Sequence, residues 1–186
     1  MEKLFSSKNK TKTIAMMGLF TAIVFVLQLL GSQIRFGTFS ISLVLVPIVI
    51  GGALYGVAAA AWLGLVFAAA TFISGDAALF LGINVFGTIL VVVVKDVACG
   101  VVSALTYRAI VKKNPKLAGA VAGVLCPIVN TGIFIIGCRI FFNHLYGGFV
   151  NIITACVGLN FVVELIINIV LSPVIIFLIK YQKKVH

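Results

Sequence analysis

The apolar run Ile89–Val94 (ILVVVV) leads directly into Lys95 and Asp96, after which the apolar sequence resumes at Val97–Val102 (VACGVV). About 20 apolar residues are enough for one helix to cross the hydrocarbon core of a membrane. A charge near the middle of such a helix costs roughly 3 kcal/mol or more, and such residues face a cavity or a partner. The stretch therefore predicts a membrane-spanning helix in which Lys95 has a functional role.

The composition of the whole chain is that of an integral membrane protein. Hydrophobic residues make up 62% and charged residues 10% of the 186 residues, whereas a soluble domain has about 45–50% and about 25%. The mean hydropathy is +1.27. Since no polar stretch is long enough to build a soluble domain, we predict a single all-α membrane domain over residues 1–186.

Six apolar runs predict a bundle of six transmembrane helices. They cover approximately residues 14–34, 40–55, 57–74, 83–107, 117–142 and 156–180. The second and third runs are short and are divided only near Gly56, so the count of this pair stays open. Pro47 lies inside the second run and should kink that helix or leave backbone carbonyls free.

Most of the net charge of +10 lies at the ends of the predicted helices, which argues against a nucleic-acid partner. Three basic clusters precede the first span, link the fourth to the fifth, and follow the sixth. An even number of spans places all three on one side, and the positive-inside rule makes that side cytoplasmic, with both termini there and close to anionic lipid. The clusters are Lys3, Lys8, Lys10 and Lys12; Arg108, Lys112, Lys113 and Lys116; and Lys180, Lys183 and Lys184.

The loops on the other side, Gln33–Phe39, Gly75–Gly82 and Asn143–Ala155, mix aromatic residues and glycine with single charges. We interpret them as lids over a site. An aromatic belt at the membrane interface explains the aromatic residues equally well, but it does not explain the lone Arg35.

Three predicted helices carry polar side chains within apolar sequence. Spacings of four and eleven residues return to the same helix face, so the fourth and sixth spans each present a polar stripe. Amides alone also serve as glue between helices, but intramembrane charges rarely persist without a role. The residues are Asn84, Thr88 and Lys95 on the fourth span, Asn130 and Thr131 on the fifth, and Asn160, Glu164 and Asn168 on the sixth.

Lys95 should lie about 16 Å deeper in the membrane than Asn84, at 1.5 Å per helical residue. The implied cavity opens outward above a cationic floor, which suits a small polar ligand with a carboxylate. A closed Lys95–Glu164 ion pair and a proton relay through both residues are the alternatives. Asp96 points about 100° away from Lys95 and should contact another helix.

Arg139 is a weaker candidate for an anion contact at the outer end of the fifth span. Nine residues separate it from Asn130, which corresponds to about half a turn, so the two side chains should lie on opposite helix faces. Near the outer end, Arg139 can also extend its charge toward the interface.

Signatures of enzymes and of metal sites are missing from the sequence. There is no GxxxxGK[ST] phosphate loop, no HExxH and no GxSxG. The four cysteines have neither CxxC nor metal-type spacing. We therefore expect no catalytic activity, no metal and no cofactor in this chain.

Several segments resemble the substrate-binding S-component of energy-coupling factor (ECF) vitamin transporters, most closely its pantothenate-type branch. They are Leu45–Gly56 (LVPIVIGGALYG), Asn84–Thr88 with Lys95, Cys126–Thr131 (CPIVNT), and the small-residue patch Gly18-xxx-Ala22 with Ala15 one turn earlier. The resemblance extends over essentially the whole chain.

This resemblance implies a multi-pass protein of the bacterial plasma membrane that binds a vitamin from outside. It also implies a transmembrane coupling (T) subunit and two cytoplasmic ATPases as partners. The coupling contact in the family is an Ala-xxx-Ala patch on the first helix, which Ala15, Gly18 and Ala22 would supply here. Lys95 would neutralise the carboxylate of a vitamin such as pantothenate. Our hypothesis is that Asn84, Asn130 and Asn160 supply hydrogen bonds beside Lys95 and that Arg35 closes the lid. The candidate substrate-binding residues, taken from the polar stripes and the outer charges, are Lys95, Asn84, Thr88, Asn130, Asn160, Glu164, Arg35 and Arg139.

Other functions remain open at this point. A riboflavin-type ligand would stack on aromatic residues of the outer loops, namely Phe36, Phe39 and Tyr146, and would need no buried cation. A membrane scaffold of another class would pack against a partner through Gly18-xxx-Ala22 and bind no small molecule. A self-sufficient proton-coupled carrier is disfavoured, because no inverted repeat is detectable in the sequence.

Overall fold

The computed structural model describes residues 7–36, 39–40, 42–142, 161–170 and 176–177. This part of the chain is almost entirely helical. Its elements are α1 (Ser7–Gly31), β1 (Arg35–Phe36), β2 (Phe39–Ser40), α2 (Leu45–Tyr55), α3 (Val57–Ile73), α4 (Ala78–Leu81), α5 (Val85–Ile110) and α6 (Pro115–Phe141), followed by the helix Phe161–Val170.

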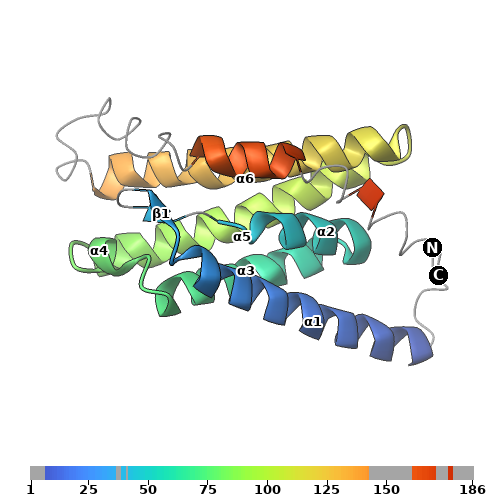
Figure 1. The fold of residues 1–186 in the computed structure, drawn as a ribbon, viewed down its shortest axis with the longest axis horizontal. Coiled ribbons are helices and arrows are strands. Elements are labelled where there is room, and N and C mark those ends of the chain that lie inside the picture. The colour runs from blue at the N-terminus through green and yellow to red at the C-terminus, as the bar shows by residue number, and fades with distance from the viewer. Residues whose placement is uncertain (1–6, 37–38, 41, 143–160, 171–175, 178–186) are drawn as a thin grey trace.

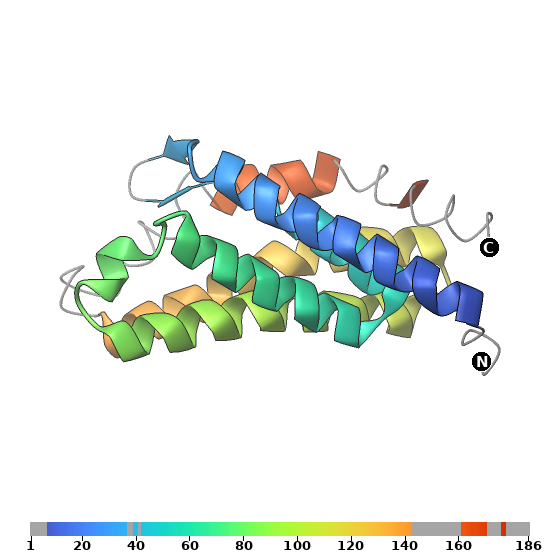
Figure 2. The ribbon, with the colours of Figure 1, turned by 90° about the horizontal axis from the view of Figure 1, so that it is seen from below.

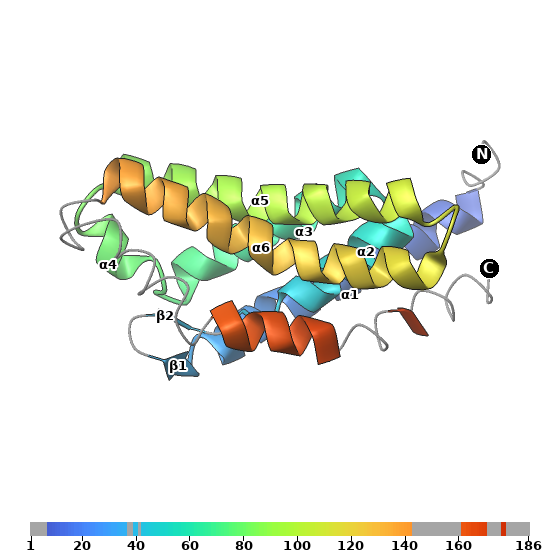
Figure 3. The same ribbon diagram turned by 90° about the horizontal axis from the view of Figure 1, so that it is seen from above.

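The long helices form an elongated bundle (Figure 1). Figure 3 shows α5 and α6 side by side along most of their length, and α3 packs on α5. In Figure 2, α1 runs across the side of the bundle formed by α2 and α3. The short α4 and the β1–β2 pair lie at one end of the bundle, and the turn between α5 and α6 lies at the other.

Within the described residues, three helices are long and apolar enough to cross a membrane: Thr11–Gly31 within α1, Val85–Ile110 and Pro115–Phe141. The other apolar helices, Leu45–Tyr55, Val57–Ile73 and Phe161–Val170, are shorter. The predicted sixth span, 156–180, lies only partly within the described residues, and the basic cluster at Lys180, Lys183 and Lys184 lies outside them.

The prediction for the second span was wrong at its start and in the effect of Pro47. Residues Phe39–Ser40 pair with Arg35–Phe36 as an antiparallel ladder, so α2 begins at Leu45 and not at residue 40. Pro47 then falls in the first turn of α2, where its missing N–H would have had no partner in the helix. It therefore neither kinks the helix nor costs a hydrogen bond.

One further detail differs from the expectations, and one long helix contains an internal proline. The predicted loop Gly75–Gly82 contains the one-turn helix α4, and Phe80 of that turn is buried against Phe134 and Phe142, with ring centroids 5.4 Å and 5.1 Å away. Helix α6 passes through Pro127 as one continuous element. The loop at Asn143–Ala155, with His144 and Tyr146, lies outside the described residues.

The contact between α3 and α5 is made by small residues, and we call it the α3–α5 seam: Ala60, Gly64, Gly100 and Ala104. A Cβ atom on Gly64 would collide with the carbonyl oxygen of Asp96, and one on Gly100 would lie 2.7 Å from the carbonyl oxygen of Ala60. The backbones of the two helices therefore touch, which only glycine permits at these positions. This close approach fixes the depth and rotation of Asp96 and of its neighbour Lys95.

One face of α1 remains open. A Cβ atom on Gly18 would meet nothing within 4 Å, and Ala15 and Ala22 are exposed. The opposite side of the helix is attached to the bundle. Phe20 packs edge-on against Tyr55, and the Thr21 hydroxyl accepts a hydrogen bond of 3.0 Å from the Trp62 indole.

Two of the predicted basic clusters lie at the same end of the bundle. Figure 3 shows the start of α1 and the α5–α6 turn at that end, away from α4 and the β1–β2 pair. The basic side chains described there are exposed: Lys12, Arg108, Lys112, Lys113 and Lys116. That these clusters share the cytoplasmic side of the membrane stays a prediction.

Candidate functional site

Lys95 is buried in the bundle, and its counter-charge is its neighbour in the sequence. The Lys95 ammonium lies 2.5 Å from Oδ1 of Asp96. The exposed fraction is 9% for Lys95 and 0% for Asp96, so both charges have left water. A charge pair held this far from water is costly to break, because removal of either partner leaves the other unpaired.

Asn130 of α6 and Phe67 of α3 complete the surroundings of this ion pair. The Asn130 amide donates to Oδ1 of Asp96 at 3.3 Å and approaches the Cys99 sulfur at 3.8 Å. The Lys95 ammonium also lies over the ring of Phe67, 4.9 Å from its centroid, in a geometry suited to a cation–π interaction. Three helices, α3, α5 and α6, thus meet at one buried charge cluster.

The expectation that Asp96 points away from Lys95 was wrong. It considered only the directions of the Cα–Cβ bonds, whereas a lysine side chain is long enough to bend around the helix toward the next residue. The expectation that Asp96 contacts another helix is confirmed by its hydrogen bond with Asn130. One acceptor is left over, because Oδ2 of Asp96 finds no partner among the described residues.

Glu164, the other expected partner of Lys95, is held differently. Its Oε1 accepts a hydrogen bond of 2.8 Å from the backbone N–H of Ser42, just before α2. Its backbone carbonyl accepts one of 2.9 Å from the amide of Asn168. Glu164 is nevertheless close enough to Lys95 and Asp96 to interact with both charges electrostatically. The buried face of the helix Phe161–Val170 is therefore turned toward the charge cluster.

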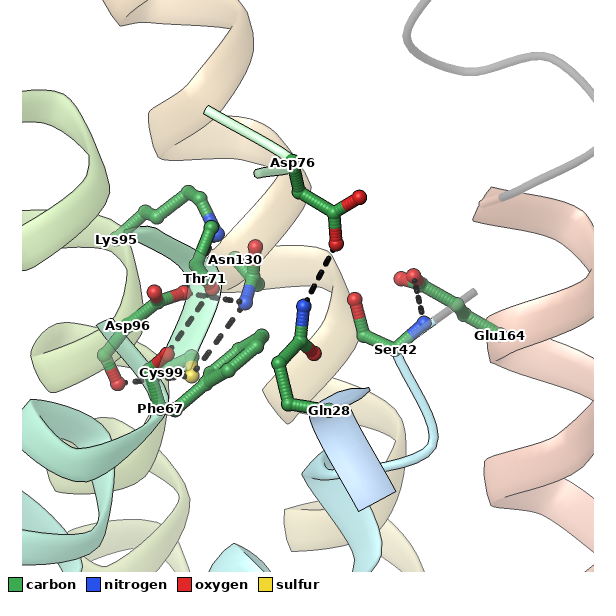
Figure 4. A network of polar contacts seen from close by, with 10 residues as sticks. All are labelled: Gln28, Ser42, Phe67, Thr71, Asp76, Lys95, Asp96, Cys99, Asn130 and Glu164. Carbon is green, nitrogen blue, oxygen red and sulfur yellow. Dashed lines mark hydrogen bonds and ion pairs between the residues drawn. The ribbon is translucent and has the colours of Figure 1, made fainter. Parts of the chain in front are cut away.

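A second polar contact at this level involves residues that the sequence did not single out. The Gln28 amide donates a hydrogen bond of 2.8 Å to Oδ2 of Asp76. Gln28 is 2% exposed, and its Oε1 has no partner in the part of the chain that the structure describes. Figure 4 shows Gln28 between Asp76 and Ser42, on the side of the network that leads to Glu164. A single amide in the run Val26–Leu30 (VLQLL) was the available signal.

Asn84 and Thr88 are engaged with the backbone. Oδ1 of Asn84 accepts from the N–H of Gly87 at 2.8 Å, which makes Asn84 the N-cap of α5. The Thr88 hydroxyl donates to the Asn84 carbonyl at 2.7 Å. Asn at this position is a preferred cap because its side chain satisfies an otherwise unpaired N–H group. Their expected role toward a ligand therefore stays a prediction.

The remaining predicted site residues are not brought to the cluster. Arg139 is exposed in the last turn of α6, whereas Asn130 is buried, so the two lie on different faces as expected. Arg35 belongs to β1, where its backbone is opposite Ser40, but its side chain lies outside the described part. Asn160 lies outside the described residues as well.

The cluster offers hydrogen bonds and charge. Within the described residues, no group of three His, Cys, Asp or Glu side chains is arranged to hold a metal ion. The described cysteines, Cys99, Cys126 and Cys138, are buried free thiols.

The chain was compared with known proteins in three ways. A family model described as "ECF transporter, substrate-specific component" matches residues 12–183, which is nearly the whole chain. The comparisons with curated proteins and with solved structures find no match.

Proposed function

Because the chain belongs to the family of substrate-specific components of ECF transporters, we propose that it captures a small polar vitamin outside a bacterial cell. Members of this family are substrate-binding membrane subunits, not enzymes, and they work with a T subunit and ATPases. The chain is accordingly a multi-pass membrane protein. Its individual substrate and its partners are the subject of the proposal.

The observation that carries the proposal is the buried charge cluster of Lys95, Asp96 and Asn130. Two charges in a membrane interior are costly and mark sites of function. Three helices contribute to the cluster, as is usual for ligand sites between helices of a bundle. Glu164 and Gln28 extend the polar surface toward the end that carries α4.

The topology we propose has six spans with both termini in the cytoplasm. It is supported by the shared placement of Lys12 and of the cluster from Arg108 to Lys116 at one end of the bundle. The polar cluster would then be reached from the outer end. This assignment requires the short helices α2 and α3 to serve as separate spans.

For the partner contact we propose the open face of α1. Ala15, Gly18 and Ala22 are small and exposed there, and such residues allow another helix to approach closely. The T subunit would pack on this face. Two cytoplasmic ATPases would supply the energy for uptake.

Pantothenate is the substrate suggested by sequence resemblance, and it stays a prediction. A ligand carboxylate could bind Lys95 only by competing with Asp96, which already lies 2.5 Å from the ammonium. The Lys95→Ala variant should abolish binding of such an anionic vitamin, at a cost in stability because Asp96 loses its partner. Isothermal titration with pantothenate, and unfolding midpoints as the folding control, would check this.

The experiment that tests the proposed function is mass spectrometry of small molecules released from the purified wild-type protein. A vitamin in the released material that rebinds and raises the unfolding temperature is the expected result. Yellow protein would identify a flavin. A protein that releases and binds no small molecule would be a scaffold, and the proposal would be wrong.

A further inference from the structure

The buried atoms that lack partners in the candidate site are all acceptors. Oδ2 of Asp96 and Oε1 of Gln28 have no hydrogen-bond partner in the described part of the chain. Both residues are almost completely buried, at 0% and 2% exposure. Buried polar atoms are normally paired, and an unpaired one calls for an explanation. A ligand that brings hydrogen-bond donors would supply the missing partners.

The orientation of the Gln28 amide is determined by Asp76. A carboxylate accepts hydrogen bonds only, so the NH₂ group of Gln28 must face Oδ2 of Asp76, 2.8 Å away. The carbonyl oxygen of Gln28 then faces the other way. In Figure 4 that direction leads toward Ser42 and Glu164. Asp76 is thus a positioning residue: it orients the Gln28 amide so that the acceptor Oε1 of Gln28 faces the interior of the polar network.

The cluster also carries more negative than positive charge. Lys95 is paired with Asp96, whereas Glu164, which is 7% exposed, accepts from the uncharged backbone N–H and side chain of Ser42 among the described residues. The three charges therefore sum to one net negative charge, inside a chain whose net charge is +10. A buried carboxylate without a direct cationic partner attracts a positive group strongly.

We infer that the substrate of this transporter carries a cationic donor group, and that Gln28 Oε1 and the Glu164 carboxylate receive it. The inference rests on the proposed function and names the chemical class of its substrate. A protonated amine or a cationic ring nitrogen fits, because each offers charge and N–H donors to two acceptors. Lys95 and Asp96 neutralise each other's charge through Oδ1 of Asp96, so neither supplies the charge that binds this group.

The direct test separates molecules by the presence of a cationic group. A small-molecule extract of bacterial cells is passed over a strong cation exchanger in acidic buffer, and both pools are added to the purified wild-type protein. The retained pool should raise the unfolding temperature. Stabilisation by the flow-through pool alone would overturn the cationic class and leave the proposed function standing. If neither pool stabilises the protein, both the cationic class of the substrate and the proposed function are contradicted.

Single variants test whether Gln28 and Glu164 bind the cationic group of the substrate. Glu164→Gln keeps the acceptor for Ser42 but removes the charge, and Gln28→Met removes the acceptor; each should weaken binding of the stabilising pool by about tenfold or more. Lys113→Gln, which changes an exposed charge at the far end, is the matched control. Unchanged binding by both variants would contradict the assignment.

The paired variant Lys95→Gln with Asp96→Asn tests whether the Lys95–Asp96 pair takes part in binding the cationic group. It removes both charges together, so no buried charge is left without its partner. Binding of the retained pool should persist within about threefold, since Glu164 still supplies the charge. Complete loss of that binding, in a variant with an unchanged unfolding midpoint, would place the recognised group on the Lys95–Asp96 pair and overturn the assignment to Gln28 and Glu164.

Discussion

Two stripes of small residues in this protein have the same spacing and opposite environments. In the α3–α5 seam, Ala60 faces Gly100 and Gly64 faces Asp96, and the two backbones are in contact. On α1, Gly18 and Ala22 repeat the four-residue spacing, but a Cβ on Gly18 would meet nothing within 4 Å. The first stripe is closed by the chain itself, and the second is open.

The comparison shows that a small-xxx-small pattern predicts that another helix can pack closely, but it does not predict which helix that is. Gly64 lies against the carbonyl oxygen of Asp96, so the seam also sets the position of the charge cluster. Gly18 has no such neighbour among the described residues. The open stripe, on a helix that is otherwise attached by Phe20 and Thr21, is the surface we propose for a partner protein.

The largest effect is expected when a larger side chain is introduced into each of the two stripes and the losses of stability are compared. Gly64→Val should lower the free energy of unfolding by about 3 kcal/mol, because the added atoms collide with backbone atoms of α5 that cannot move independently. Gly18→Val, the matched variant, should change it by less than about 0.5 kcal/mol. Unfolding in mixed detergent micelles measures both. Equal losses for the two variants would show that the α1 stripe is also closed in solution.

A smaller effect is expected on assembly. Gly18→Leu should leave the stability of the isolated protein unchanged but weaken its complex with the T subunit and ATPases about tenfold, which is about 1.4 kcal/mol. Co-purification of the complex from membranes, with Leu19→Ala as a neighbouring control, measures this. Undiminished assembly of the Gly18 variant would move the partner surface away from α1.

The smallest effect concerns a third glycine in open surroundings. A Cβ on Gly132, in the middle of α6, would also meet nothing within 4 Å. Gly132→Ala should therefore stabilise the protein by about 0.5–1 kcal/mol through helix propensity alone. The same unfolding assay applies. Destabilisation would indicate that this face of α6 is in contact with something in the folded protein.

Local sequence signals predicted the helices well where glycine marks both ends. The third span was expected at 57–74, and α3 covers Val57–Ile73. Its flanking glycines, Gly56 and Gly75, have positive φ angles, which stop a helix. The start of α2 was predicted less well, because the pairing of Phe39–Ser40 with Arg35–Phe36 depends on the turn between them and not on hydrophobicity.

The candidate site was only partly predictable. The burial of Lys95 follows from its place in an apolar run, and the sequence showed it. Its choice of Asp96 over Glu164 depends on how a long side chain bends within a packed bundle. The contact of Gln28 with Asp76 joins residues 48 positions apart, so it appears only in the folded structure.

The capping role of Asn84 was available in the sequence but was not recognised. An Asn directly before an apolar run is a preferred N-cap, and Asn114 before Pro115 shows the same signal at the start of α6. Asn84 was instead counted within the fourth span and assigned to the ligand. A polar residue at the edge of a span therefore needs to be tested as a cap before it is considered as a binding residue.

The corner between α2 and α3 has a consequence for how this chain can vary in length. One residue, Gly56, with φ 94°, joins the two helices, and a Cβ on Gly52 would lie 3.0 Å from that of Ala60 across the corner. One inserted residue would rotate α3 by about 100° relative to α2. Gly64 would then turn away from α5, and a side chain would face the Asp96 carbonyl instead. Insertions and deletions that are harmless in a loop would therefore disrupt the charge cluster here, although the changed residue does not contact it.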